Sequence, residues 1–174
     1  MKKAFSLLEL VIVIAISAIL FLVVTGFLIT VVSQNNKVTV DSEVRNEANF
    51  LLDQIVKDIR KSKCECTTAN SIALYGVSSC ASQCAGGAGP TPYASYSVSS
   101  YNLLKNSVTI NSSGVKVRYC SDNCICAAPA LGLVIGSTPG RVYDVTLNIN
   151  QAKDNPRSDF CGKVTVQQTV TPRN

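Results

Sequence analysis

The chain has 174 residues, of which 47% are hydrophobic and 16% are charged, and its 16 Lys and Arg against 11 Asp and Glu make a formal net charge of +5. It contains eight Cys but no His and no Trp. Without His, neither a Ser-His-Asp nor a Cys-His catalytic arrangement can form, and a zinc site cannot have an imidazole ligand. These classes of catalytic and metal site are excluded, and from the sequence as a whole we expect no enzymatic activity and no cofactor.

The first predicted element is a membrane helix. Residues 10–32 read LVIVIAISAILFLVVTGFLITVV, and the uncharged stretch runs on to Asn36. About 20 such helical residues span a bilayer core of about 30 Å. A secretory signal peptide has a shorter apolar region followed by a small-residue cleavage site, and this stretch has neither. The Lys residues at positions 2 and 3 predict a cytoplasmic N-terminus, with the rest of the chain outside.

A carboxylate, Glu9, stands directly before this stretch in the sequence FSLLELVIVIAI. An ionised group at membrane depth costs several kcal/mol unless it is paired. One explanation is local, because Ser6 and Glu9 fit the S-x-x-E capping box and an acidic residue complements the helix dipole at this end. The other explanation is a partner outside the helix.

The start of the chain, MKKAFSLLELVIVIAISAIL, resembles the leader and N-terminal helix of type IV pilins and pseudopilins. The matching order is a short basic leader, the small residue Ala4, then Phe5, Glu9 and a long apolar helix. The resemblance implies that a prepilin peptidase removes residues 1–4 as a leader by cutting between Ala4 and Phe5, and methylates the new Phe5 amine. It also implies that Glu9 pairs with the Phe5 amine of a neighbouring subunit, so that assembly relieves an unfavourable charge.

Two features depart from the commonest pattern of that family. The residue before the cut is usually Gly, whereas this chain has Ala4, which is also small. Many pilins carry a Pro within the apolar helix, whereas this chain has Gly26 at that depth. Gly weakens a helix by about 1 kcal/mol relative to Ala, so Gly26 is either a point of local melting or a close helix contact.

The helix is predicted to continue past the membrane. Residues 5–36 form its transmembrane and assembly half, and residues 37–63 form an amphipathic half that ends in basic residues. Apolar residues recur there at spacings of three and four, a pattern that predicts one face packed on a sheet: Val40, Val44, Ala48, Leu51, Leu52, Ile55 and Ile59. Residues 46–63 also resemble, more loosely, the helix end of J-type minor pseudopilins and related minor pilins.

Residues 64–174 are predicted to form a Cys-rich globular head. Its cysteines are Cys64, Cys66, Cys80, Cys84, Cys120, Cys124, Cys126 and Cys161. An even number in an exported domain predicts disulfides. Zinc is the alternative, because the pairs 80/84 and 120/124 have the spacing of zinc knuckles. No C-x-x-C occurs, so a thioredoxin-like redox centre is not expected, and the spacing leaves the pairing open.

Within the head, residues 76–100 are uncharged and rich in Ser, Gly, Ala and Pro, which predicts a loop between helix and sheet. Alternating apolar residues further on predict four to five antiparallel strands. They lie at 108–110 and 115–119, joined as a hairpin by residues 111–114, and at 131–135, 143–149 and 164–170. The predicted fold class is therefore α+β, a pilin-like long N-terminal helix packed on an antiparallel sheet with a disulfide-rich head.

Other candidate sites in the head are weak. Asp154, Asn155 and Asp159 could place oxygens around calcium, but solvated turn residues more often explain such a cluster, so no metal is predicted. The basic residues are scattered and are not interleaved with aromatic residues, so no nucleic-acid partner is predicted either.

The sequence predicts a structural subunit of a type IV pilus-like or type II secretion-type filament, more specifically a minor pilin or pseudopilin. Its expected partners are other pilin or pseudopilin subunits, the prepilin peptidase and the assembly machinery. It would sit in the bacterial inner membrane with its head in the periplasm, and reach the cell surface after assembly. A major pilin is one alternative. An alternative of another class is a membrane-anchored periplasmic binding or adhesion module that never enters a filament.

Overall fold

The computed structural model describes residues 7–68, 71–79, 84–85, 89–120, 132–138, 142–151 and 162–172. The chain divides into two units, residues Met1–Val38 and Thr39–Asn174. The first unit contributes only helix, and all the described strands belong to the second, which we call the head.

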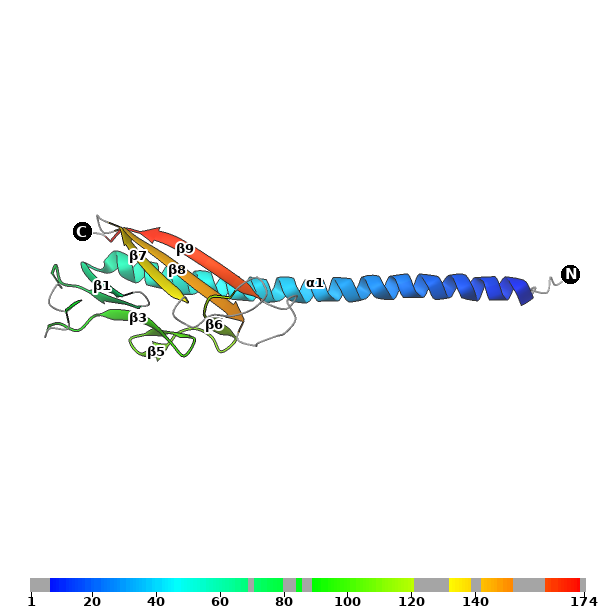
Figure 1. The fold of residues 1–174 in the computed structure, drawn as a ribbon, viewed down its shortest axis with the longest axis horizontal. Coiled ribbons are helices and arrows are strands. Elements are labelled where there is room, and N and C mark those ends of the chain that lie inside the picture. Colours follow the sequence, from blue (N-terminus) through cyan, green and yellow to red (C-terminus); the bar gives the residue numbers. More distant parts are fainter. Residues whose placement is uncertain are drawn as a thin grey trace. The chain divides into compact units, whose positions relative to one another are not determined.

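The N-terminal element is the helix α1, which spans Leu7–Lys61 (Figure 1). In the head, one face of α1 is buried, and its residues confirm the predicted apolar stripe from Val44 to Ile59, with Val56 added to it. Val40 is partly buried against the same core. The helix ends where the backbone N–H of Ser62 donates to the carbonyl of Ile59 at 3.0 Å and its hydroxyl donates to the same oxygen at 2.6 Å.

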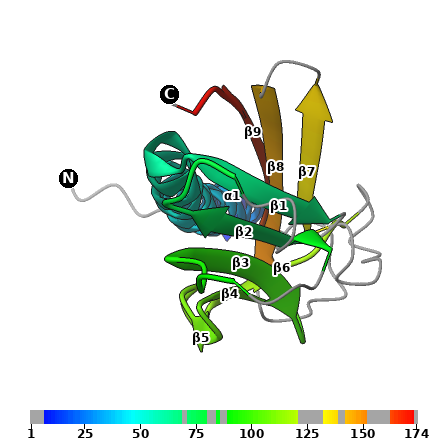
Figure 2. The same cartoon turned by 90° about the vertical axis from the view of Figure 1, so that its left-hand side faces the viewer.

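Five strands form the first antiparallel sheet, in which each strand pairs with the next along the chain (Figure 2). They are β1 (Cys64–Thr68), β2 (Ser71–Tyr75), β3 (Ala94–Ser99), β4 (Asn102–Lys105) and β5 (Val108–Thr109). Alternate residues of β2 and β3 point into the core, since side chains on a strand alternate between its two faces.

The second sheet is built around one long strand. Its members are β6 (Val115–Val117), β7 (Leu133–Thr138), β8 (Val142–Gln151) and β9 (Lys163–Val170), and the other three all pair antiparallel with β8 (Figure 1). The predicted alternation of Tyr143, Val145, Leu147 and Ile149 is confirmed, because all four are buried. The same holds for Val164 and Val170 of β9.

One core joins the head half of α1 to both sheets. Leu51, Ile55 and Ile59 of the helix are fully buried together with Tyr96 of β3 and Leu147 of β8. Each fully buried side chain of this size contributes about 1.5–3 kcal/mol by leaving water. The α+β, pilin-like fold class predicted from the sequence is therefore confirmed.

The predicted hairpin between residues 108–110 and 115–119 is wrong. β5 pairs with β4 of the first sheet, whereas β6 pairs with β8 of the second, so the chain changes sheets between them. Asn111 occupies this crossing and is buried. Its side chain accepts from the backbone N–H of Leu103 at 2.8 Å and donates to the carbonyl of Val115 at 2.7 Å. One side-chain amide thus bonds to a backbone group of each sheet. In a hairpin, pairing between the two strands would satisfy these backbone groups instead.

The number of strands and sheets also differs from the prediction. The described residues form nine strands in two sheets, where four to five strands in one sheet were expected. β3 occupies Ala94–Ser99, the last part of the segment expected to be a loop. Its core-facing residues Ala94 and Tyr96 alternate with Ser, so the strand has the correct period but too little hydrophobicity to stand out from its Ser-rich surroundings.

Two tight turns of the first sheet have unusual backbone conformations. Ser100 and Tyr101 join β3 to β4 with φ of 49° and 65°, and Asn106 and Ser107 join β4 to β5 with φ of 51° and 69°. Positive φ at both central residues is the type I′ hairpin geometry that matches strand twist, and it normally favours Asn-Gly. Neither pair contains Gly, so both turns carry backbone strain that the strand pairing offsets.

Candidate assembly segment and the disulfide-linked head

The apolar half of α1 is exposed along its length. Every residue from Leu7 to Thr30 is exposed, and large side chains such as Leu22 and Phe21 are more than 70% exposed. By length and composition this helix can cross a membrane. An apolar surface of this extent is unfavourable in water, so it needs a bilayer or other apolar helices around it.

The three hydroxyl side chains in this segment donate hydrogen bonds within the helix. Each hydroxyl donates to the backbone carbonyl four residues earlier: Ser17 to Val13 at 2.8 Å, Thr25 to Phe21 at 2.7 Å and Thr30 to Gly26 at 3.0 Å. Such bonds remove the need for water as a partner, so these residues are compatible with an apolar environment.

Glu9 lies in the first turn of α1 and is exposed. Ala4 and Phe5, the residues of the predicted cleavage and methylation site, lie outside the described residues, and so does Ser6 of the alternative capping box. The pairing of Glu9 with the Phe5 amine of a neighbour therefore stays a prediction, since it needs a second subunit.

Gly26 is helical, and a Cβ built on it would meet no atom of this chain within 4 Å. The two predicted roles, local melting and a close helix contact, both concern the assembled state and stay predictions. A larger residue here would meet no obstacle within the chain itself.

The head holds a polar cluster at the C-terminal end of α1. The Asp58 carboxylate accepts from the Tyr96 hydroxyl at 2.6 Å and from the Lys105 ammonium, also at 2.6 Å. The ammonium lies 5.5 Å from the centre of the Tyr96 ring, within the range of a cation–π contact. The Tyr93 hydroxyl donates to the backbone carbonyl of Asp58. Residues from α1, β3 and β4 are tied together by this one carboxylate.

The environment of this cluster changes the acidity of its members. Burial opposes ionisation of Asp58, but the hydrogen bonds from Lys105 and Tyr96 outweigh it, so the pKa of this carboxyl lies below its ordinary value. Burial, followed by the charges of Asp58 and Glu65, raises the pKa of Tyr93 to about 12. Burial and the hydrogen bond to Asp58 raise the pKa of Tyr96 further. At neutral pH both phenols are thus neutral: that of Tyr96 donates to the Asp58 carboxylate, and that of Tyr93 donates to the Asp58 backbone carbonyl.

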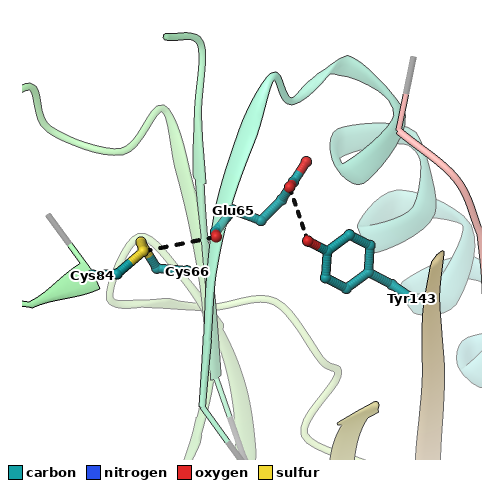
Figure 3. The surroundings of a disulfide bond; sticks show 4 residues. All are labelled: Glu65, Cys66, Cys84 and Tyr143. Carbon is teal, nitrogen blue, oxygen red and sulfur yellow. Dashed lines mark hydrogen bonds between the residues drawn. A yellow bond between two sulfur atoms is a disulfide. The ribbon is translucent and has the colours of Figure 1, made fainter. Parts of the chain in front are cut away.

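A second polar contact joins the two sheets beside the helix end. The Tyr143 hydroxyl of β8 donates to the Glu65 carboxylate of β1 at 3.0 Å, and the Ser62 hydroxyl lies within hydrogen-bond distance of the other carboxylate oxygen. Figure 3 shows the Glu65 side chain pointing toward Tyr143. Glu65 therefore connects the end of α1 with both sheets.

A disulfide between Cys66 and Cys84 lies next to this contact (Figure 3). The two Cα atoms are 5.2 Å apart, within the normal range for such a bond. The Cys84 sulfur also lies 3.8 Å from the Glu65 carbonyl oxygen, which is a contact and not a hydrogen bond, because an oxidised sulfur has no proton to donate. The bond fastens Cys84, which follows β2, back onto β1, an edge strand that pairs with β2 alone among the described strands.

The other predicted cysteine and calcium positions are only partly covered. Cys64 and Cys120 are disulfide-bonded as well, so no cysteine in the described part of the chain is free. The remaining cysteines, Cys80, Cys124, Cys126 and Cys161, and the calcium candidates Asp154, Asn155 and Asp159, lie outside the described residues. Within the described residues, no three potential ligands gather where they could hold a metal ion.

The Asp58 cluster could not be predicted from the sequence. Asp58 and Tyr96 are 38 residues apart in sequence, and Asp58 looks like any charged residue on the rim of an amphipathic helix. Its one distinguishing feature is its position in α1, directly before the buried Ile59.

Among known protein families, one motif matches the start of the chain. Residues 1–25 match the prokaryotic N-terminal methylation motif. The match supports a type IV pilin-like prepilin. It covers the leader, the predicted cleavage site, Glu9 and most of the apolar half of α1, and it implies processing by a prepilin peptidase and assembly with other pilin subunits. No curated protein and no solved structure matches the chain.

Proposed function

We propose that this prepilin is a structural, non-catalytic subunit of a type IV pilus-like or type II secretion-type filament, and that it is a minor pilin or pseudopilin. The observation that supports the proposal is the methylation motif at residues 1–25, together with an apolar segment of α1 in which every residue from Leu7 to Thr30 is exposed. This segment is not covered by the described part of its own chain. It gains its burial first from the bilayer and then from neighbouring helices.

In this proposal the chain enters the bacterial inner membrane with its N-terminus in the cytoplasm and its head in the periplasm. The peptidase cuts between Ala4 and Phe5 and methylates Phe5. Glu9 then pairs with the Phe5 amine of a neighbouring subunit, which neutralises two charges that are costly in an apolar environment. Apolar packing supplies the cohesion, and this charge pair sets the register.

Replacing Glu9 tests the proposal. We expect Glu9→Ala to reduce the amount of protein in sheared filaments at least about tenfold, because an unpaired amine would be left in the apolar core. The amount in the membrane should not change. Ser17→Ala, in the same helix, is the control and should behave as the wild type. Normal incorporation of Glu9→Ala would contradict the role of Glu9, whereas absence of the wild type itself from sheared filaments would favour the membrane-anchored binding or adhesion module.

The choice between a minor and a major subunit rests on the looser resemblance of residues 46–63 to minor pseudopilins and on the elaborate head, with its two sheets and several disulfides. Quantitative mass spectrometry of purified filaments separates the two. A minor subunit should be a small fraction of filament protein, whereas a dominant band of this chain would identify a major pilin.

A further inference from the structure

The solvent face of α1 in the head carries opposite charges at its two ends. Glu43, Phe50 and Lys57 are spaced by seven residues and so lie on one face of the helix. All three are exposed, and Phe50 in the middle is 64% exposed. Glu47 adds a carboxylate near the first end, and Lys61 adds an ammonium at the other. The face therefore runs from acidic through aromatic to basic, with one further exposed carboxylate, Asp53, one turn before Lys57.

A groove lies beside the acidic end of this face. Its volume is about 520 Å³, and its lining combines the apolar side chains of Val40, Val44 and Val115 with the carboxylates of Glu43 and Glu47. One Glu47 carboxylate oxygen accepts from the backbone N–H of Ser112 at 2.8 Å, which holds this side chain at the rim. An apolar floor with a carboxylate rim suits a long basic side chain, whose methylene stem packs on apolar surface while its charged end stays at a polar edge.

We propose that a second copy of this chain supplies that basic side chain. The groove beside Glu43 and Glu47 of one copy docks on the basic helix end, at Lys57 and Lys61, of the next. The inference rests on the proposed function, because membrane insertion gives all copies the same orientation and hence parallel helices.

The spacing along the helix makes the two surfaces complementary. From Glu43 to Lys57 is 14 residues, and from Glu47 to Lys61 is also 14 residues. Sliding one helix by 14 residues, about 21 Å at 1.5 Å per residue, therefore brings both pairs together at once. Because the two surfaces differ, the contact is heterologous, and heterologous contacts whose rotation does not close generate open filaments.

Two alternative partners would explain fewer of these observations. A nucleic acid or an anionic lipid surface would attract the basic end alone and would leave the acidic groove without a role. A second copy uses both surfaces and explains their equal spacing. Charge complementarity between exposed patches also favours the correct partner over like-charged ones.

Charge exchange in the full-length protein, expressed in its native host, tests the proposal. One variant carries Glu43→Lys with Glu47→Lys, and the other carries Lys57→Glu with Lys61→Glu. Each makes both docking surfaces alike in sign, so we expect about a tenfold loss of filament-incorporated protein. Gln167→Lys on β9 with Thr67→Lys on β1, both exposed, is the control for added charge and should assemble normally.

Two combinations separate lost docking from lost folding. The chain with all four substitutions regains complementary surfaces and should assemble to near the wild-type level. The two half-variants expressed together should also co-assemble, in alternation. If the half-variants assemble as well as the wild type, or if the fourfold variant is no better than they are, the docking proposal is overturned while the filament function stands. If the wild type itself does not assemble, both fail.

The partner is identified by a photo-crosslinking residue at position 46, in place of the exposed Asn46 on the groove lining. We expect adducts between two copies of this chain that map to residues 57–63. The same probe in place of Thr169 on β9 should not yield them. Adducts only with nucleic acid or lipid, or between copies at another surface, would contradict the proposed contact.

Discussion

The two halves of α1 place the same kind of side chain in opposite surroundings. Leu22 in the apolar half is 72% exposed, whereas Leu51 in the head is fully buried against both sheets. The head satisfies its own helix residues within one chain, and the apolar half leaves its residues to be covered from outside. The stability of the head and the assembly of the chain should therefore respond to different substitutions.

The largest difference between the two halves is expected when a leucine in each half is replaced by alanine. We expect Leu51→Ala to destabilise the head by about 2–5 kcal/mol, because it leaves a cavity in a packed core. Leu22→Ala should leave the free energy of unfolding of the head unchanged. Both are measured by chemical denaturation in detergent. Equal losses for the two variants would contradict the separation between the halves.

Removing the Cys66–Cys84 disulfide should also act on the head alone. The bond closes a loop between residues 18 apart in sequence, and the chain-entropy account gives about 3 kcal/mol for a loop of this size. We expect the double variant Cys66→Ser with Cys84→Ser to unfold at lower denaturant concentration, with normal membrane insertion. An unchanged unfolding midpoint would mean that the segment after β2 is held by other contacts.

The Asp58 cluster sharpens the comparison through pH. The pKa of Asp58 in the folded head lies below its ordinary value of 3.8, so its stabilising contribution is present above that value and is lost as the pH falls through the folded pKa. Near neutral pH the wild type should be more stable than Asp58→Asn. The difference should shrink below about pH 4, as followed by acid unfolding of both proteins. If the difference in stability persists at lower pH, it comes from side-chain packing and not from the charge of Asp58.

The smallest expected effect is a gain in the stability of the head. Ser107 is exposed and has a φ of 69° in the turn between β4 and β5, after Asn106. Ser107→Gly creates the Asn-Gly pair that this turn geometry favours, and should stabilise the head by about 1 kcal/mol. The midpoint of thermal unfolding should rise accordingly. A fall would show that the hydroxyl of Ser107 has a role that outweighs the backbone strain.

Periodic, strongly apolar elements could be predicted from the sequence. The helix stripe from Val44 to Ile59 and the alternation in β8 each repeat often enough to be recognised, because their buried faces are continuous. The first strands could not, since β1 and β3 consist largely of Ser, Thr, Cys and small residues, and β2 and β4 have only five and four residues. The change of sheet at Asn111 depends on a side chain that bonds to the backbone of Leu103 and of Val115, in different sheets, and hydrophobic alternation does not encode such bonds.

The candidate assembly site could likewise be predicted only in part from the sequence. Glu9 and the order of residues before it could be recognised from the sequence, because a carboxylate beside a long uncharged stretch is physically costly. The acidic groove could not be predicted, since Val115 and Ser112 come to Glu47 only through the fold.

The measurement that tests the central claim most directly is the intact mass of the protein from native host membranes, without reductant. We expect a chain that begins at Phe5, carries one added methyl group, and is lighter by about 2 Da for each disulfide. A mass that retains Met1 to Ala4, without methylation, would contradict processing as a prepilin and leave a disulfide-containing head on a simple membrane anchor.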